Sequence, residues 1–194
     1  MAGGRPPGSS RPPSSSSPAT PGSSTCCYGR RYNSVLEIGC GAGAFTRMLA
    51  PFADRIVALD IAEGAIARGV GAEHVDFRVA NVRGFEPSPR PWDLVVMSET
   101  IYYLGWLYSF FDVAWLASHL FSASEEGGRL LLTNAEGDVE DYLILPWIVR
   151  TYRDLFLNVG YELESEDVFR ATKHSVAFEA LMSLFARPKK GRQS

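Results

Sequence analysis

The chain has 194 residues, a formal net charge of −3 and a hydrophobic content of 46%. This size and composition suit one folded domain with a single core, so a second folded domain is not expected. The slight excess of acidic residues gives no general attraction to phosphate backbones, which argues against a nucleic-acid partner.

The N-terminal segment has the composition of a disordered chain. Ser, Pro or Gly occupies 18 of the first 25 positions, and such a sequence buries too little apolar surface to offset the entropy lost on ordering. We therefore expect residues 1–30 to be disordered. Residues 31–188 should form the folded domain, followed by a basic tail over residues 189–194.

Cysteine content and hydropathy bear on the compartment in which the protein works. The three cysteines, two of them adjacent, match neither a zinc-binding spacing nor a paired disulfide framework, which favours a reducing compartment. The longest apolar run, residues 142–149, is far shorter than the ~20 residues that span a bilayer, and the N-terminal residues lack the apolar stretch of about 7–15 residues that is typical of a secretory signal. We expect a cytoplasmic protein without a membrane partner or a bound metal; the oligomeric state stays open.

Short apolar runs alternate with helical stretches from Tyr32 onward, which is the pattern of βαβ units in a parallel sheet. The expected strands cover residues 34–38, 55–59, 75–79, 94–97 and 129–133. The expected helices are one through Phe45, Met48 and Leu49 and three over residues 62–68, 102–121 and 148–159.

Two further strands, over residues 161–168 and 177–185, end the domain. The link between them is shorter than the dozen or more residues of a parallel crossover, so the two strands should form an antiparallel hairpin. The sequence therefore predicts an α/β fold that is Rossmann-like and doubly wound, with a mostly parallel seven-stranded sheet and an antiparallel last strand.

A glycine-rich loop follows the first strand, where residues 35–43 read Val-Leu-Glu-Ile-Gly-Cys-Gly-Ala-Gly. Glycines at such a turn let the backbone approach a ligand closely and adopt positive φ without strain. Gly39, Gly41 and Ala44 also satisfy the dinucleotide-binding fingerprint, with Asp60 about 20 residues further on. The loop alone is therefore compatible with an NAD-dependent oxidoreductase as well as with an S-adenosylmethionine enzyme.

Glu37 favours one of these two classes. A carboxylate two residues before the first glycine would repel a pyrophosphate by several kcal/mol, at ~4 Å and an effective dielectric of about 20. It suits a cation instead. S-adenosylmethionine offers an ammonium and a sulfonium, and its carboxylate can rest on the exposed N–H groups of a helix N-terminus. The sequence thus favours a methyltransferase, with the oxidoreductase as the alternative.

Polar residues at the ends of the following strands complete the expected cofactor site. Asp60 is suited to accept hydrogen bonds from both ribose hydroxyls, or to cap the next helix. Asn81, or the N–H of Val82, is placed to hold the adenine edge, with a turn role as the alternative for Asn81. The expected cofactor-binding residues are Glu37, Gly39, Cys40, Gly41, Asp60, Ile61, Asn81, Val82 and Ser98.

Three residues are candidates for the acceptor side. Glu99 follows the fourth strand beside the topological switch point, where its carboxylate can accept a proton or a hydrogen bond from an amine or hydroxyl. Tyr102 lies close to it in sequence. His174 falls in the expected hairpin, which should emerge at the cofactor side. The aromatic residues from Tyr102 to Trp115 form either an acceptor wall or ordinary helix core packing.

These residues resemble the nodulation protein S family of class I S-adenosylmethionine-dependent methyltransferases, from about Arg31 to Pro188. The glycine motif marks the superfamily; the segments 98–104, 156–161 and 181–188 carry the closer resemblance. Known members N-methylate the free amine of a chitin-like oligosaccharide. The resemblance implies methyl transfer to an amine or hydroxyl of a small molecule, such as an amino sugar or oligosaccharide, with S-adenosylmethionine as cofactor.

The chain departs from this family at two places. Asn81 stands where an acidic residue is usual, and a Ser/Pro/Gly-rich stretch stands where lid helices normally precede the first strand. A lid excludes water from the reaction, so its loss would lower both cofactor affinity and activity. A non-catalytic or truncated cofactor-binding domain is therefore a further alternative.

Overall fold

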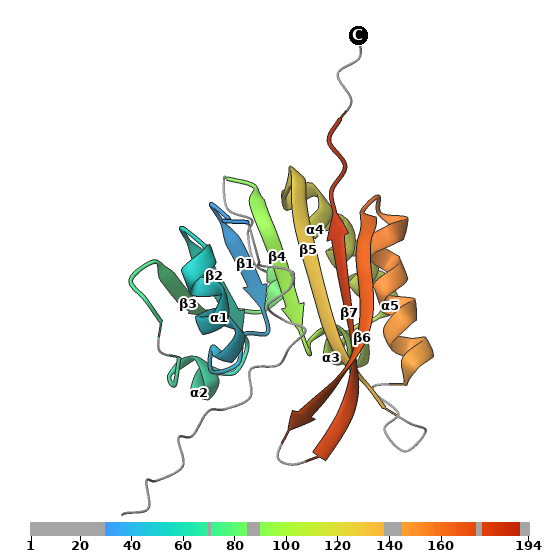
Figure 1. The fold of residues 1–194 in the computed structure, drawn as a ribbon, viewed down its shortest axis with the longest axis horizontal. Coiled ribbons are helices and arrows are strands. Elements are labelled where there is room, and N and C mark those ends of the chain that lie inside the picture. The colour runs from blue at the N-terminus through green and yellow to red at the C-terminus, as the bar shows by residue number, and fades with distance from the viewer. Residues whose placement is uncertain (1–29, 70, 85–89, 138–144, 174–175, 191–194) are drawn as a thin grey trace, which may run out of the picture.

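The computed structural model describes residues 30–190, except 70, 85–89, 138–144 and 174–175 (Figure 1). Its strands form one seven-stranded sheet in the order β3-β2-β1-β4-β5-β7-β6. The strands are β1 (Val35–Ile38), β2 (Ile56–Asp60), β3 (Val75–Val79), β4 (Trp92–Ser98), β5 (Ser124–Glu136), β6 (Glu162–Lys173) and β7 (Val176–Ala186).

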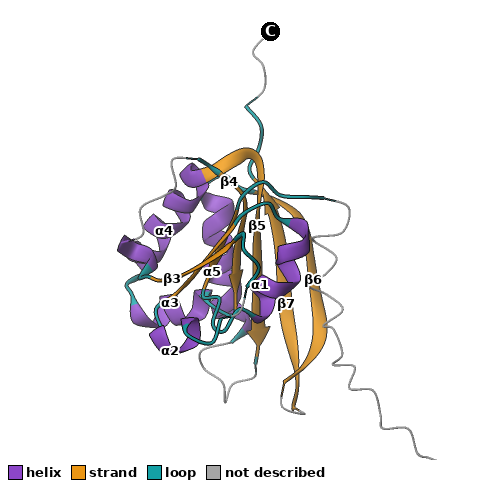
Figure 2. Cartoon of the chain, turned by 90° about the vertical axis from the view of Figure 1, so that its left-hand side faces the viewer, coloured by secondary structure: helices purple, strands orange, loops and turns teal. Residues whose placement is uncertain are grey.

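Helices cover the sheet on both faces, as the side view in Figure 2 shows. α1 lies on one face, and α3, α4 and α5 lie together on the other. The helices are α1 (Ala44–Leu49), α2 (Glu63–Ile66), α3 (Ile101–Leu107), α4 (Phe110–Ala123) and α5 (Pro146–Asn158), with short 3-10 turns η1 (Ala50–Phe52) and η2 (Val82–Gly84).

The strand directions confirm the predicted doubly wound α/β class. β1 to β5 pair in parallel, and β7 runs antiparallel to both β5 and β6. The chain proceeds from β1 outward to β3 and then returns to place β4 on the other side of β1. The loops that leave β1 and β4 therefore diverge, and the gap between them is where sheets of this kind bind ligands.

The parallel strands are buried on both faces, which explains their continuous apolar sequences. In β4, Val95 and Met97 pack toward α3 and α4, whereas Leu94 and Val96 belong to the cluster on the α1 side. All four side chains are completely buried. Each contributes about 1.5–3 kcal/mol by leaving water, so the strand tips that carry the polar residues are rigidly held.

The prediction of a single helix over residues 102–121 is wrong, because the chain breaks between α3 and α4. Tyr108 is extended (φ −125, ψ 161), and Ser109 starts α4 with a capping box. The Ser109 hydroxyl accepts from the Asp112 N–H and the Asp112 carboxylate accepts from the Ser109 N–H, both at 3.2 Å. This Ser-x-x-Asp signal overrides the continuous apolar pattern.

Several expectations concern residues outside the described part of the chain. They are the disorder of residues 1–30 apart from Arg30, most of the basic tail and the position of His174. Arg30 is described, and its guanidinium donates to the Gly127 carbonyl at 3.2 Å, so the predicted disorder does not extend to this residue. The domain limits 31–188 likewise stay a prediction. Within the residues that the structure describes, no helix is both long and apolar enough to cross a membrane.

Candidate functional site

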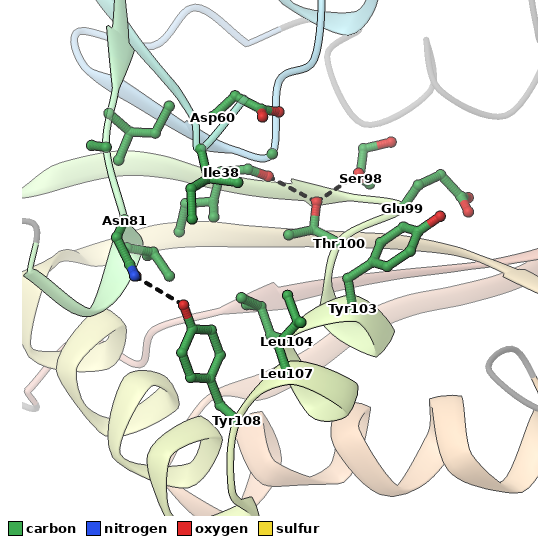
Figure 3. A pocket seen from close by; sticks show the side chains of 15 residues that line it. Ile38, Asp60, Asn81, Ser98, Glu99, Thr100, Tyr103, Leu104, Leu107 and Tyr108 are labelled. Carbon is green, nitrogen blue, oxygen red and sulfur yellow. Dashed lines mark hydrogen bonds between the residues drawn. The ribbon is translucent and has the colours of Figure 1, made fainter. Parts of the chain in front are cut away.

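A pocket of about 430 Å³ opens at the carboxyl ends of β1, β2, β3 and β4 and extends under α3 (Figure 3). The lining includes seven of the residues expected from sequence: Gly39, Asp60, Ile61, Asn81, Val82, Ser98 and Glu99. Among the lining residues, Asp60 and Glu99 carry the charge. The pocket is otherwise largely apolar and therefore favours a cationic or neutral ligand over a polyanion.

Asp60 ties together the loops that follow β1 and β2. One carboxylate oxygen accepts the N–H of Gly41 and the other accepts the N–H of Ala62, each at 2.8 Å. The sequence left open that Asp60 caps the next helix, but the N-cap of α2 is Ala62 and no side chain caps it, so the bond to the Ala62 N–H shapes the turn after β2 instead. A carboxylate has about four acceptor positions, so Asp60 organises the loop and keeps capacity for ligand hydroxyls.

Gly39 is required by a close contact within the protein. It has φ +77, and a Cβ added there would lie 2.2 Å from Oγ1 of Thr100. The Thr100 hydroxyl donates to carbonyl oxygens of Ile38 (3.0 Å) or Ser98 (2.8 Å), which joins the β1 and β4 tips (Figure 3). At Gly41 (φ +54) an added Cβ would meet nothing within 4 Å, so this glycine faces open space.

Substituting Gly39 should therefore destabilise the fold more than substituting its neighbour. We expect Gly39→Ala to lower the free energy of unfolding by about 2–3 kcal/mol, from positive φ plus overpacking against Thr100. Gly41→Ala, with positive φ alone, should cost about 1–2 kcal/mol. Urea denaturation of both variants measures the difference.

Gly64 supplies the matched control. It lies in α2, where an added Cβ would meet nothing within 4 Å, so Gly64→Ala should change stability by less than about 1 kcal/mol. Equal losses in the Gly39 and Gly41 variants would show that the Thr100 contact does not constrain the loop.

Glu37 does not belong to the pocket lining, although its place two residues before Gly39 predicts a contact with the cofactor. Its side chain is 1% exposed, and its Oε2 accepts a 2.6 Å hydrogen bond from the Thr46 hydroxyl on α1. Burial raises the pKa of Glu37 to about 7; the Thr46 bond offsets part of this rise, and the charge of Asp60 adds to it. Glu37 is thus a buried group whose charge state changes near neutral pH.

Cys40 and Gly41 also fall outside the lining. Cys40 is buried, and its thiol contacts the Gly41 carbonyl at 3.6 Å. Burial, followed by the nearby charges of Glu37 and Asp60, raises the pKa of Cys40 to about 12, so this thiol stays protonated and unreactive. The N–H of Gly41 donates to Asp60 and so helps to fix the position of a carboxylate that lines the pocket.

Glu99 has an unusual backbone conformation at the tip of β4. Among the described residues it is the one non-glycine residue with positive φ (54), a conformation that costs about 1–2 kcal/mol. The N–H of Glu99 donates to the Thr133 carbonyl at 2.7 Å. Its Oε2 accepts from the Tyr102 hydroxyl at 3.0 Å and from the Ala135 N–H at 3.1 Å. Such strain, maintained at the edge of a pocket, is typical of functional positions.

Tyr102 lies behind Glu99 and does not line the pocket. Its side chain is 8% exposed. Burial, and then the charge of Glu99, raise the pKa of Tyr102 well above its ordinary value, so its hydroxyl remains a donor to the carboxylate. Tyr102 is therefore a positioning residue for Glu99. Ser98 lines the pocket, and its hydroxyl accepts from the Thr133 hydroxyl at 2.9 Å.

Several lining residues were missed or only partly anticipated from the sequence. Thr100 received no role there, whereas Tyr103 and Tyr108 were noted within an aromatic cluster of undecided function. The Ser109 capping box could have identified Tyr108. Because a new helix begins at Ser109, Tyr108 lies in the short link between α3 and α4, where it lines the pocket. Within the described residues, no group of three or more His, Cys, Asp or Glu side chains could hold a metal ion.

Comparison with known proteins identifies the family. The family model described as a methyltransferase domain matches residues 16–183 of the chain. The chain belongs to the methyltransferase domain family. The matched range contains every residue that lines the pocket, so the pocket is a feature of the methyltransferase domain itself.

A curated relative gives a closer match over a shorter range. Nodulation protein S of Sinorhizobium fredii (strain NBRC 101917 / NGR234) is 41% identical to the methyltransferase domain over 75 residues. This alignment covers 37% of the chain and 34% of the relative, so the chain spans about a third of the relative's length.

Solved structures share the fold of the methyltransferase domain. The N-methyltransferase NodS from Bradyrhizobium japonicum WM9 superposes with a TM-score of 0.69 at 22% identity, over 82% of this chain and 88% of that chain. Its complex with S-adenosyl-L-homocysteine superposes with a TM-score of 0.68 at 22% identity, over 82% and 80%. At this identity the likeness establishes the fold.

Proposed function

We propose that the chain is an S-adenosylmethionine-dependent methyltransferase that transfers a methyl group to an amine or a hydroxyl of a small molecule. The observation that carries this proposal is the pocket at the strand tips, with Asp60 and Glu99 as its charged lining. Family membership supports the same activity and gives no support to the NAD-dependent oxidoreductase alternative. A cytoplasmic location and residues 31–188 as the domain complete the proposal.

The residues present fit S-adenosylmethionine. Asp60 retains acceptor capacity for ribose hydroxyls, and the open space at Gly41 leaves the loop backbone accessible to a ligand. The pocket volume of about 430 Å³ lies within the range of about 300–1,000 Å³ that is usual for small-ligand sites. The S-adenosyl-L-homocysteine complex of the structurally similar NodS supports this choice of cofactor.

The chain's own residues would align the acceptor and receive its proton. S-adenosylmethionine supplies an electrophilic methyl group when bound. Glu99 is placed to accept a proton or a hydrogen bond from an amine or hydroxyl acceptor, and Tyr102 and the Ala135 N–H hold its carboxylate in one orientation. Alignment of this kind contributes up to ~7–11 kcal/mol in the best intramolecular cases.

An amine is the acceptor that the similar proteins favour, since NodS is named an N-methyltransferase. Glu99 would bind an acceptor that arrives as an ammonium and take the proton that it must lose before reacting. An amino sugar or an oligosaccharide with a free amine is one such acceptor. Tyr103, 48% exposed at the pocket, offers an aromatic face against which a sugar ring can pack.

An activity assay tests the proposal. Purified protein is incubated with S-adenosylmethionine and a panel of amino sugars, chitin-derived oligosaccharides with a free amine, simple amines and alcohols, and S-adenosylhomocysteine formation is measured. We expect acceptor-dependent product with at least one amine. Binding of the cofactor without product from any acceptor would favour the non-catalytic cofactor-binding domain, which the short alignment with nodulation protein S keeps as the second candidate.

Cofactor affinity tests the role of Asp60. We expect Asp60→Ala to weaken S-adenosylhomocysteine binding by about 1.5–3 kcal/mol for each charge-assisted hydrogen bond lost. Calorimetry measures the affinity, and the same titration with NAD should give no binding.

Asp76→Ala is the control, because Asp76 is an aspartate on β3 that pairs with Arg78 at the surface. The Asp76→Ala variant should bind S-adenosylhomocysteine with the same affinity as the unchanged protein. Asp60→Asn removes the charge but keeps the side-chain size and one of the two oxygens that accept the Gly41 and Ala62 N–H groups, so its thermal midpoint should fall less than that of Asp60→Ala. Unchanged affinity in both Asp60 variants would rule out the ribose contact.

A further inference from the structure

Tyr108 is placed at the pocket by the break between α3 and α4. Its backbone is extended, its side chain is half-buried, and its hydroxyl lies beside Asn81 at the end of β3 (Figure 3). Nδ2 of Asn81 lies 2.9 Å from the Tyr108 oxygen. With the ribose at Asp60, as proposed above, the base of the cofactor would lie next to it along the strand tips, near Asn81 and Tyr108.

The hydrogen-bond network fixes which atom of Asn81 faces Tyr108. Oδ1 of Asn81 lies 3.0 Å from the backbone N–H of Arg83, which can only donate. The other side-chain atom, which faces Tyr108, is therefore the NH₂ group, and this group can only donate. It follows that the Tyr108 hydroxyl accepts from Asn81 and that its own proton points elsewhere. Among the described residues, no contact takes up that proton.

The ring of Tyr108 is held as well as its hydroxyl. The Arg83 guanidinium lies over the ring, 5.4 Å from its centroid, and pairs with the Asp112 carboxylate at 3.0 Å. Asp112 in turn forms the capping box with Ser109 at the start of α4. A tyrosine whose ring and oxygen are both held in this way offers its hydroxyl from one position. Such preorganisation favours specific recognition of one ligand atom.

We propose that the Tyr108 hydroxyl donates a hydrogen bond to a ring nitrogen of the cofactor's adenine and thereby determines base specificity. This inference rests on the proposed function, in which S-adenosylmethionine is the cofactor. Adenine offers acceptors at its ring nitrogens and donors only at its exocyclic amine. The NH₂ group of Asn81 spends one of its two N–H donors on Tyr108, and the Tyr108 hydroxyl then offers its own proton to a base at this wall of the pocket, beside the backbone N–H of Val82.

Calorimetry with S-adenosylhomocysteine and its 1-deaza, 3-deaza and 7-deaza analogues tests the proposal without an activity assay. In each analogue a C–H replaces one ring nitrogen. We expect Tyr108→Phe to bind S-adenosylhomocysteine about three- to tenfold more weakly, as for a neutral hydrogen bond. For one of the three analogues the unchanged protein and Tyr108→Phe should bind equally, because the accepting nitrogen is then already missing.

Tyr152→Phe is the matched control. Tyr152 is a half-buried tyrosine on α5 whose hydroxyl donates to the Gly105 carbonyl at 3.2 Å, and it does not line the pocket. It should leave the affinity for all four ligands unchanged. If Tyr108→Phe binds S-adenosylhomocysteine normally, or loses the same factor with every analogue, the donor role is refuted. Absence of S-adenosylhomocysteine binding by the unchanged protein would instead refute the proposed function.

Discussion

Glu99→Gln is expected to lower the turnover number of methyl transfer by about 10²–10⁴-fold while leaving cofactor affinity nearly unchanged. The substitution keeps the size of the side chain and an oxygen that can accept from Tyr102 and from the Ala135 N–H. It removes the negative charge and the ability to take a proton. Turnover is measured with the best amine of the acceptor panel, and affinity by calorimetry with S-adenosylhomocysteine.

The size of the loss distinguishes two roles of Glu99. Removal of a general base gives the larger values, whereas loss of an orienting hydrogen bond gives a smaller decrease that does not depend on acceptor basicity. Tyr102→Phe should fall between Glu99→Gln and the unchanged chain, because it releases the carboxylate without removing it. Rescue of Glu99→Gln at higher pH, where an amine acceptor is already deprotonated, would mark proton removal as the missing step.

Glu126→Gln is the control for this experiment. Glu126 is exposed in the first part of β5, far along the strand from Thr133, which contacts Ser98 at the pocket. Its turnover should be unchanged. Normal turnover in Glu99→Gln would exclude both roles, and a loss of cofactor affinity in proportion to rate would assign Glu99 to the cofactor side.

The strand tips could be predicted from the sequence because they depend on local patterns. Apolar runs locate parallel strands, and the carboxyl ends of such strands meet at one edge of the sheet. Asp60, Asn81, Ser98 and Glu99, which the strand pattern places at this edge, line a common pocket in the structure. This prediction did not depend on side-chain direction, because residues at the carboxyl ends of strands lie at that edge of the sheet whichever face their side chains point to.

Side-chain direction was the part that the sequence could not supply. Tyr102 and Tyr103 are adjacent on α3, so they point about 100° apart on the helix; one lies beneath Glu99 and the other lines the pocket. The direction of Glu37 depends on Thr46, which α1 brings over β1. Position in the chain alone suggests a cofactor contact for Glu37, whereas tertiary packing buries it.

Glu37→Gln should change how stability depends on pH. Burial raises the pKa of Glu37 to about 7, from an ordinary value of 4.5. Below pH 4.5 the side chain is protonated in the folded and unfolded states, so it carries no ionisation cost. As pH rises toward 7, the unfolded chain gains stability by ionising while the folded chain keeps its proton. The unchanged protein should therefore lose about 3 kcal/mol of unfolding free energy relative to Glu37→Gln across this window.

Urea denaturation of both proteins from pH 4 to pH 8 measures this difference, and Glu126→Gln, a substitution at an exposed residue of β5, is measured alongside them as the control. A difference that stays flat, or that grows in favour of the unchanged protein as pH rises, would contradict a raised pKa.

The experiment is then repeated with saturating S-adenosylhomocysteine, which carries an ammonium. If that ammonium lies close enough to interact with Glu37, it stabilises the carboxylate and moves the midpoint of the pH dependence downward. An unmoved midpoint would show that Glu37 has no electrostatic contact with the ligand, and its role would then be structural, through the hydrogen bond with Thr46.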